Sequence, residues 1–306
     1  MSTSQTSALV LPRLRHPVRT IGRRTFDFDT QIAVMAIINR TPDSFYDAGK
    51  TFALDHAVAA AVQAASDGAD WVDIGGVPFK PGPELPVAEE IERVVPVIEA
   101  LAAVSDVVIS VDTFQSAVAE AAIAAGAGVI NDTTGIHDVR LADVVADSEA
   151  TLVITHSLAR PRQAYPRPQY ADVATDIVGF LGSRIDLALS RGIPEERIVV
   201  DPGHDLNKNT LHTLELTRRF GEIAALGFPT LAAVSNKDFI GESLDRDKPD
   251  RLAGSLAAAT VCAMLGARIV RMHNVPAAVD AMRMVEAILG WRAPVRAVHN
   301  MGEANV

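Results

Sequence analysis

The sequence alternates eight times between a short apolar run rich in β-branched residues and a longer segment with helical periodicity. The eight short runs cover residues 32–39, 71–76, 107–113, 128–133, 151–156, 198–203, 229–235 and 267–275. Successive positions within each run are apolar, which is typical of parallel strands buried on both faces. Eight strand–helix repeats within about 250 residues predict a single-domain α/β fold, the TIM (β/α)8 barrel, because a doubly wound sheet usually has fewer strands and a clear switch point.

The longer segments carry apolar residues at spacings of three and four. They cover approximately residues 54–67, 86–103, 115–125, 140–148, 170–191, 211–226, 250–265 and 276–289. In the first of them Val58, Ala61 and Val62 fall on one helical face. Glycines such as Gly126 and Gly192 follow the predicted helices, where a left-handed residue often ends a helix. The repeats leave no room for an interdomain linker.

The two ends of the chain differ from the repeats. Residues 1–25 contain five arginines and no acidic residue, whereas the whole chain carries 28 Lys+Arg and 38 Asp+Glu. We therefore expect a basic flexible N-terminal arm over residues 1–25, a barrel over 26–292 and a flexible C-terminal tail over 293–306. Whether the arm binds an anionic partner stays open.

Composition excludes several classes of protein. The formal net charge of −10 argues against a nucleic-acid partner. Cys262 is the single cysteine, so an intrachain disulfide or a cysteine-based metal cluster cannot form, and a reducing compartment is favoured. The N-terminus lacks the layout of a secretory signal, and the longest uncharged stretch, residues 252–267, is too short and too weakly apolar to span a bilayer. We expect a cytoplasmic protein with no membrane partner.

The longest connections follow strands rather than precede them. They cover residues 40–53, 77–85, 157–169, 204–210 and 236–249. The chemistry of a TIM barrel lies at the carboxyl ends of its strands, so this end is predicted to carry the site. Residues 160–168 form a basic, proline-stiffened segment that is either a lid over an anionic ligand or a solvated loop.

Polar residues end several of the predicted strands. Asp112, Asn131 and Asp201 end the third, fourth and sixth strands, and Lys237 follows the seventh. Two carboxylates, an amide and an ammonium present acceptors and donors suited to a flat, nitrogen-rich heterocycle. A structural polar layer that caps the core is the alternative, but four such residues together favour a ligand.

A second group follows from the last strand. Arg271 and His273 alternate along it, so both side chains project to the same side, and barrel closure brings Asn39 close. This arrangement favours a phosphate group, although Arg271 could instead pair with Asp43 or Asp47.

Two further ideas concern histidines. A metal site of Asp201, His204 and Asp205 is disfavoured, because one turn supplies too few ligands in a defined geometry. His156 is either a base or a histidine that is hydrogen-bonded in place.

Seven motifs in order resemble dihydropteroate synthase over about residues 26–290. They are Asn39-Arg-Thr-Pro-Asp-Ser-Phe45, Asp73-Ile-Gly-Gly76, Ser110-Val-Asp-Thr113, Ile130-Asn-Asp132, Asp201-Pro-Gly203, Ser235-Asn-Lys237 and Arg271-Met-His273. The resemblance implies a TIM barrel, usually a homodimer. It also implies a reaction in which 6-hydroxymethyl-7,8-dihydropterin pyrophosphate loses pyrophosphate, aided by magnesium, and p-aminobenzoate captures the methylene group.

The resemblance further implies a role for each matching residue. Asp112, Asn131, Asp201 and Lys237 would bind the pterin. Arg271, His273 and Lys80 would bind the pyrophosphate, and Asn39 would bind Mg2+. Cationic groups and a metal ion suit charge that develops on a departing pyrophosphate. A corrinoid-linked methyltransferase shares the barrel and the pterin pocket, but the Lys237 and Arg271/His273 motifs favour the synthase branch.

The acceptor side departs from the family pattern. Glu-Ser-Thr-Arg-Pro-Gly is replaced by residues 77–82, in which Lys80 keeps a charge without an arginine fork. Ile-Gly-Phe-Gly-Lys is replaced by residues 204–208, and the second serine of Ser-Arg-Lys-Ser by Asp238. If Asp238 faces the acceptor carboxylate, two like charges at about 4 Å cost about 4 kcal/mol at an effective dielectric constant of about 20.

The sequence therefore predicts a pterin-binding paralogue with an altered p-aminobenzoate side and weak or no synthase activity. The alternative is a functional dihydropteroate synthase of folate biosynthesis.

Overall fold

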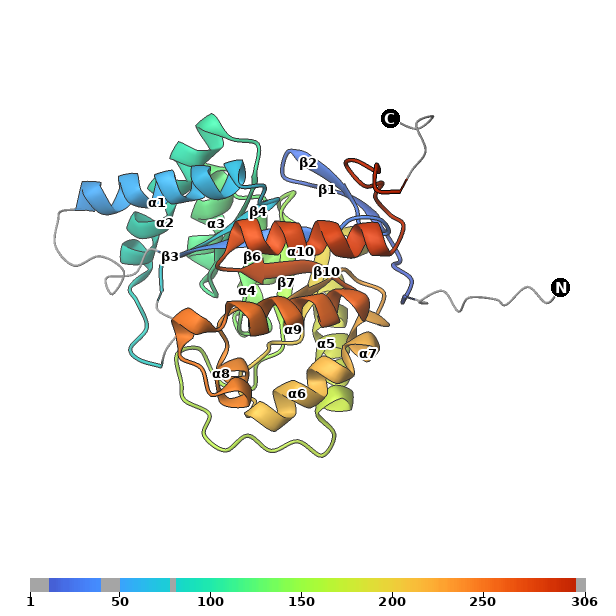
Figure 1. Cartoon of the computed structure of the whole chain (residues 1–306). Helices are drawn as coiled ribbons and strands as arrows, with labels where there is room; N and C mark the ends of the chain where they lie inside the picture. The colour runs from blue at the N-terminus through green and yellow to red at the C-terminus, as the bar shows by residue number, and fades with distance from the viewer. Residues whose placement is uncertain (1–10, 40–49, 78–80, 301–306) are drawn as a thin grey trace.

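The computed structural model describes residues 11–39, 50–77 and 81–300. Its centre is a closed barrel of eight parallel strands in the order β10-β3-β4-β5-β6-β7-β8-β9 (Figure 1). The strands are β3 (Ala33–Asn39), β4 (Trp71–Gly75), β5 (Val108–Asp112), β6 (Val129–Asp132), β7 (Thr151–Thr155), β8 (Ile198–Asp201), β9 (Thr230–Ala232) and β10 (Ala267–Met272). Each strand lies within a run that the sequence predicted, and the TIM barrel is confirmed.

Helices surround the barrel (Figure 1). They are α1 (Lys50–Ser66), α2 (Val87–Val104), α3 (Ser116–Ala125), α4 (Val139–Ala146), α5 (Val173–Ser190), α6 (Thr210–Arg218), α7 (Phe220–Ala224), α8 (Asp238–Leu244), α9 (Leu252–Met264) and α10 (Val275–Ile288), with short 3-10 turns η2 (Glu195–Arg197) and η3 (Lys248–Asp250). The predicted helix over 211–226 is divided at Arg219 into α6 and α7. Helix α8 lies in a segment that the sequence predicted to be a loop.

Alternation along the strands divides the barrel interior into two layers. On β4, Trp71 and Asp73 share one side, whereas Val72 and Ile74 belong to the apolar cluster that packs under the helices. The lower interior layer is apolar and includes Met35, Trp71, Val108, Val129, Val153, Val199, Leu231 and Ile269. The layer towards the carboxyl ends is polar, so the same strands that build the core also present the site.

A hairpin covers the amino-terminal end of the barrel. Strands β1 (Val18–Ile21) and β2 (Arg24–Asp27) pair antiparallel. Ile21 and Phe26 are buried, and the Phe26 ring lies 6.0 Å from that of Trp71 in an edge-on arrangement. This differs from the expected flexible arm over residues 1–25, because burial of the hairpin's apolar side chains holds residues 18–25 against the barrel.

The arginines of the hairpin have partners within the chain. Arg19 donates to the carbonyl oxygens of Glu196 at 2.9 Å and Ile198 at 2.6 Å. Arg24 forms an ion pair with Asp70 at 3.0 Å. Residues 1–10 and 301–306 lie outside the described residues. Within the described residues, no helix combines the length and apolarity needed to cross a membrane.

Candidate functional site

Asp73 is the centre of a buried hydrogen-bond network at the carboxyl end of the barrel. Its Oδ1 accepts from Ser110 Oγ at 2.7 Å, and its Oδ2 accepts from Asn131 Nδ2 at 3.0 Å and Arg271 Nε at 2.7 Å. The Asp73 side chain is fully buried, so each of these donors offsets the cost of removing its charge from water. The sequence placed Asp73 in a motif but gave it no role. The available signal was its position two residues after Trp71 on the same strand, which places both side chains on the inward face.

Asp112 lies beside this network. It is the register partner of Asn131 on the neighbouring strand, and its Oδ2 is 3.8 Å from Arg271 Nη2. Burial and the nearby Asp73 carboxylate raise the pKa of Asp112 to about 7, although Arg271 opposes this shift. Two of the four predicted pterin ligands are therefore adjacent, and one of them titrates near neutral pH.

Asp201 and Lys237 come from the other side of the barrel. Asp201 Oδ1 accepts from Gly203 N at 2.7 Å, and burial raises the pKa of this carboxyl. Burial lowers the pKa of the Lys237 ammonium, whereas the nearby carboxylates of Asp205 and Asp201 act to raise it. The guanidinium of Arg271 interacts electrostatically with Asp73, Asp112 and Asp201. The four predicted pterin ligands thus lie at one end of the barrel around Arg271.

Arg271 and His273 project from β10 as predicted. The His273 ring Nδ1 is 2.9 Å from Ser235 Oγ, which also accepts from the His273 backbone at 3.2 Å. Desolvation and the nearby cations Arg271 and Lys237 lower the pKa of His273 to about 4, so the ring is neutral at pH 7. Arg271 pairs with Asp73 at 2.7 Å.

Several predictions for the phosphate side lie outside the described residues. They concern Lys80, Asp43, Asp47 and the side chain of Asn39. The backbone of Asn39 is placed, in register with Gly75 at the carboxyl end of β3. This strand neighbours β10, as barrel closure requires.

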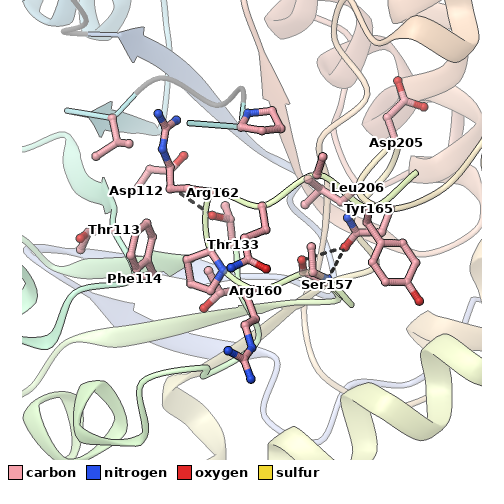
Figure 2. A pocket seen from close by; sticks show the side chains of 18 residues that line it. Asp112, Thr113, Phe114, Thr133, Ser157, Arg160, Arg162, Tyr165, Asp205 and Leu206 are labelled. Atoms are coloured by element: carbon pink, nitrogen blue, oxygen red, sulfur yellow. Dashed lines mark hydrogen bonds between the residues drawn. The ribbon is translucent and has the colours of Figure 1, made fainter. Parts of the chain in front are cut away.

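A cavity of about 210 Å³ opens at this end (Figure 2). Asp112, Thr113 and Phe114 line one end of it, and Asp205, Leu206 and Tyr165 line the other. The segment 157–165, which we call the strap, supplies much of the remaining lining, including Arg160 and Arg162.

The strap is attached at both ends. At one end, Asn207 Oδ1 accepts from Ser157 Oγ at 3.0 Å, Leu158 N at 2.7 Å and Ala159 N at 2.9 Å. At the other end, the Arg162 carbonyl accepts from Gly82 N at 3.0 Å, and Arg162 Nε donates to the Pro83 carbonyl at 3.2 Å. The basic segment predicted as a lid or a solvated loop therefore spans the mouth between the β8 and β4 sides. That it covers an anion stays a prediction.

His156 has a structural environment. Its Nδ1 is 2.9 Å from Lys208 Nζ, which also donates to the carbonyls of Gly203 at 2.8 Å and Leu206 at 3.0 Å. Burial and the neighbouring Lys208 lower the pKa of His156 to about 2, and burial lowers that of Lys208 to about 7. This environment favours the hydrogen-bonded interpretation over a base.

His204 is likewise enclosed. It stacks on Phe220 at 6.0 Å and Phe239 at 6.3 Å, and its Nε2 is 3.9 Å from Cys262 Sγ. In the part of the chain that the structure describes, no three His, Cys, Asp or Glu side chains are grouped to hold a metal ion. The three-ligand site with Asp201 and Asp205 therefore has no support here.

Asp238 does not face the recess, contrary to the sequence-based prediction. Its side chain is 76% exposed and pairs with Arg251 Nη1 at 3.1 Å. The reason is that Asp238 begins α8, where its backbone N–H donates to Asp205 Oδ2 at 2.6 Å while the side chain points outwards. Asp205, not Asp238, is the carboxylate that lines this end of the cavity.

The geometry defines a class of protein: a TIM barrel whose mouth offers carboxylate, amide and cationic groups to a small polar ligand. A family model described as "Pterin binding enzyme" matches residues 35–273. The chain belongs to the dihydropteroate synthase family of pterin-binding enzymes.

Three relatives illustrate this membership. A Mycobacterium tuberculosis protein named inactive dihydropteroate synthase 2 is 44% identical over 88% of this chain and 86% of its own length. Dihydropteroate synthase of Escherichia coli is 37% identical over 84% of this chain and 91% of its own length. The structure of Xanthomonas albilineans dihydropteroate synthase with 4-aminobenzoic acid superposes with a TM-score of 0.83 at 39% identity, covering 89% of this chain and 98% of that one.

Proposed function

We propose that this protein binds a pterin pyrophosphate and has weak or no dihydropteroate synthase activity with p-aminobenzoate. The observation that carries the pterin assignment is the convergence of Asp112, Asn131, Asp201 and Lys237 around Arg271. Carboxylate oxygens would accept from the ring N–H and amino groups of a pterin, while the Asn131 amide and the Lys237 ammonium would donate to its acceptors. Solved relatives include the Xanthomonas albilineans enzyme in complex with 7,8-dihydropteroate.

The pyrophosphate would lie beside Arg271 and His273, with Lys80 as a further cation. Since Asp73 accepts from Nε of Arg271, the phosphate oxygens would use the remaining guanidinium donors. The neutral His273 ring can donate one hydrogen bond without adding charge.

Magnesium is part of the same proposal. Mg2+ is usually bound by one or two protein oxygens together with phosphate oxygens of the substrate. Asn39, at the end of a strand next to Arg271, provides an amide oxygen of the required kind. A bound Mg2+ would neutralise charge that develops on the leaving pyrophosphate.

The acceptor side supports the proposed loss of activity. Asp205, Leu206 and Asn207 line the cavity where the family motif has Gly-Phe-Gly, and Val77 lines it where the motif has glutamate. These changes remove an aromatic face, and they replace a carboxylate at position 77 by one at position 205. The 44% identity to a mycobacterial relative named inactive dihydropteroate synthase 2 points the same way.

We also propose a cytoplasmic homodimer, as is usual for the family. The adjacent helices α9 and α10 carry exposed apolar side chains, with Val261 45%, Met284 58% and Ile288 64% exposed. Burial of such side chains against a second copy would remove apolar surface from water.

Active synthase is the second candidate function. It is favoured by the outward orientation of Asp238, which removes the predicted repulsion of an acceptor carboxylate at that position. An activity assay with magnesium, pterin pyrophosphate and p-aminobenzoate separates the two functions. Our proposal expects no rescue of a strain that lacks its own synthase and less than about 1% of the turnover of an active relative, equivalent to a barrier about 2.7 kcal/mol higher. Robust turnover and rescue would establish the second candidate.

A further inference from the structure

Asp205 has a backbone conformation that non-glycine residues rarely adopt. Its φ is +63°, in the left-handed region. A residue held there at the edge of a cavity is a reason to ask what its side chain does. Asp205 lines the end of the cavity opposite Asp112, Thr113 and Phe114 (Figure 2).

The Asp205 carboxylate is fixed in place by the first turn of α8. Its Oδ2 accepts from the backbone N–H groups of Asp238 at 2.6 Å and Phe239 at 3.3 Å. These bonds hold the carboxylate beside Lys237, the residue that precedes this helix. The negative charge at this end of the cavity is therefore part of the folded structure.

Lys237 does not leave a spare positive charge for a second ligand. Its ammonium interacts with three carboxylates of the same chain, Asp205, Asp201 and Asp238. Arg271 is engaged in a similar way by Asp73 at 2.7 Å. A ligand carboxylate at this end would be repelled by Asp205, and the nearby cations Lys237 and Arg271 are already paired with other carboxylates. Binding of such a ligand is therefore electrostatically unfavourable.

We propose that this end of the cavity takes an uncharged or cationic amine as its second ligand, and that Asp205 discriminates against amines that carry a carboxylate. The inference rests on the proposed function, because it assumes that the second ligand binds beside a pterin. The strap arginines lie away from Asp205: Arg162, whose Nε donates to the Pro83 carbonyl, is beside Asp112 at the other end of the cavity, and Arg160 lies elsewhere along the cavity wall (Figure 2).

The test compares p-aminobenzoate with 4-aminobenzamide, an amine of similar shape without the charge. Calorimetry would use the full chain saturated with 6-hydroxymethylpterin and pyrophosphate. We expect wild type to bind the amide at least about tenfold more tightly. Asp205→Asn keeps an oxygen for the α8 N–H groups and removes the charge, so the preference should fall to about threefold or less. Asp205→Gly serves as a second variant without any side-chain charge.

Asp245→Asn is the matched control, because it removes an exposed carboxylate from the far end of the same helix, and asparagine tolerates the left-handed backbone of that position. It should leave the preference for the amide unchanged. Equal affinities in wild type, or an unchanged preference in both Asp205 variants, would overturn the inference. Binding of the pterin without binding of either amine would also overturn it while leaving pterin binding intact. Failure of the pterin to bind would instead contradict the proposed function.

Discussion

Nε of Arg271 lies 2.7 Å from Oδ2 of Asp73, joining β10 to β4 over the intervening strand β3. Asp73 is fully buried, and the same oxygen also accepts from Asn131. The pair therefore fixes the direction of Arg271, the group around which the other site residues lie. Such a pair contributes orientation more reliably than net stability, because burying both charges has its own cost.

Asp73→Asn should disrupt this arrangement. The variant leaves the Arg271 guanidinium partly buried with a weaker partner, and we expect a loss of about 3 kcal/mol in the free energy of unfolding. Urea denaturation measures this loss, and pterin affinity should fall with it. Ser110→Ala removes a single neutral donor to the same carboxylate and should cost only about 1 kcal/mol. Equal stability of Asp73→Asn and wild type would show that the pair does not organise the mouth.

The raised pKa of Asp112 predicts that pterin binding depends on pH. In the folded protein this carboxyl takes up a proton as pH falls through about 7, whereas in the unfolded chain it does so near its ordinary value of 3.8. The ionised form is the acceptor for pterin N–H groups, so affinity should rise between pH 6 and pH 8. Asp112→Asn should bind weakly and lose this pH dependence. An unchanged profile in the variant would assign the titration to another group.

The same shift determines a contribution to stability. A folded-state pKa above the unfolded value means that the native protein binds more protons between about pH 4 and pH 7. The contribution of Asp112 to the free energy of unfolding should therefore decrease as the pH rises from about 4 to about 7. Asp112→Asn should make this decrease smaller. Denaturation of both proteins at pH 5 and pH 8 measures the difference.

Asn207→Gly should release one end of the strap. Glycine tolerates the left-handed backbone of this position, where φ is +51°, but it cannot accept the hydrogen bonds from Ser157, Leu158 and Ala159. Hydrogen exchange at the Leu158 and Ala159 amides should accelerate at least about tenfold. Arg162→Ala, which acts at the other end, should leave these two amides protected. Slow exchange in Asn207→Gly would mean that other contacts hold the strap.

Phe26→Ala should destabilise the whole barrel, because Phe26 packs against Trp71 beneath the interior layer. Truncation of such a buried ring costs about 3–5 kcal/mol. Val18, on the same hairpin, is 61% exposed, and Val18→Ala should change stability by less than about 0.5 kcal/mol. Thermal or chemical unfolding distinguishes the two variants. A harmless Phe26→Ala would restore the interpretation of residues 18–25 as an independent arm.

The sequence predicted the barrel well because its signal is local and repeated. Glycines such as Gly126 and Gly192, both at positive φ, end the helices where the pattern indicated. The hairpin was missed because its arginines dominate the composition, although buried Ile21 and Phe26 alternate with exposed Thr20 and Thr25. Helix α8 was missed because it is short and its first turn is capped by Asp205, which lies far from it in the chain.

The sequence predicted which residues meet at the mouth of the barrel, but only some of the contacts that they make; their ligand stays a prediction. Asp112, Asn131, Asp201 and Lys237 follow from strand ends and motifs, since barrel topology brings such positions together. The orientation of Asp238 could not follow in the same way, because the start of a helix directs that side chain to Arg251. The partners of Asp73 likewise depend on which side chains share an interior layer of the barrel. A single sequence indicates this only through the alternation of inward- and outward-facing residues along each strand.

The most direct test of this account is calorimetry of the two half-sites in one preparation of the full chain. Pterin pyrophosphate is titrated first with magnesium, and p-aminobenzoate is then titrated into the complex. We expect pterin affinity within about tenfold of that of an active dihydropteroate synthase, and p-aminobenzoate affinity at least about a hundredfold weaker. Comparable weakening of both ligands, or full affinity for both, would contradict an intact pterin half beside an altered acceptor half.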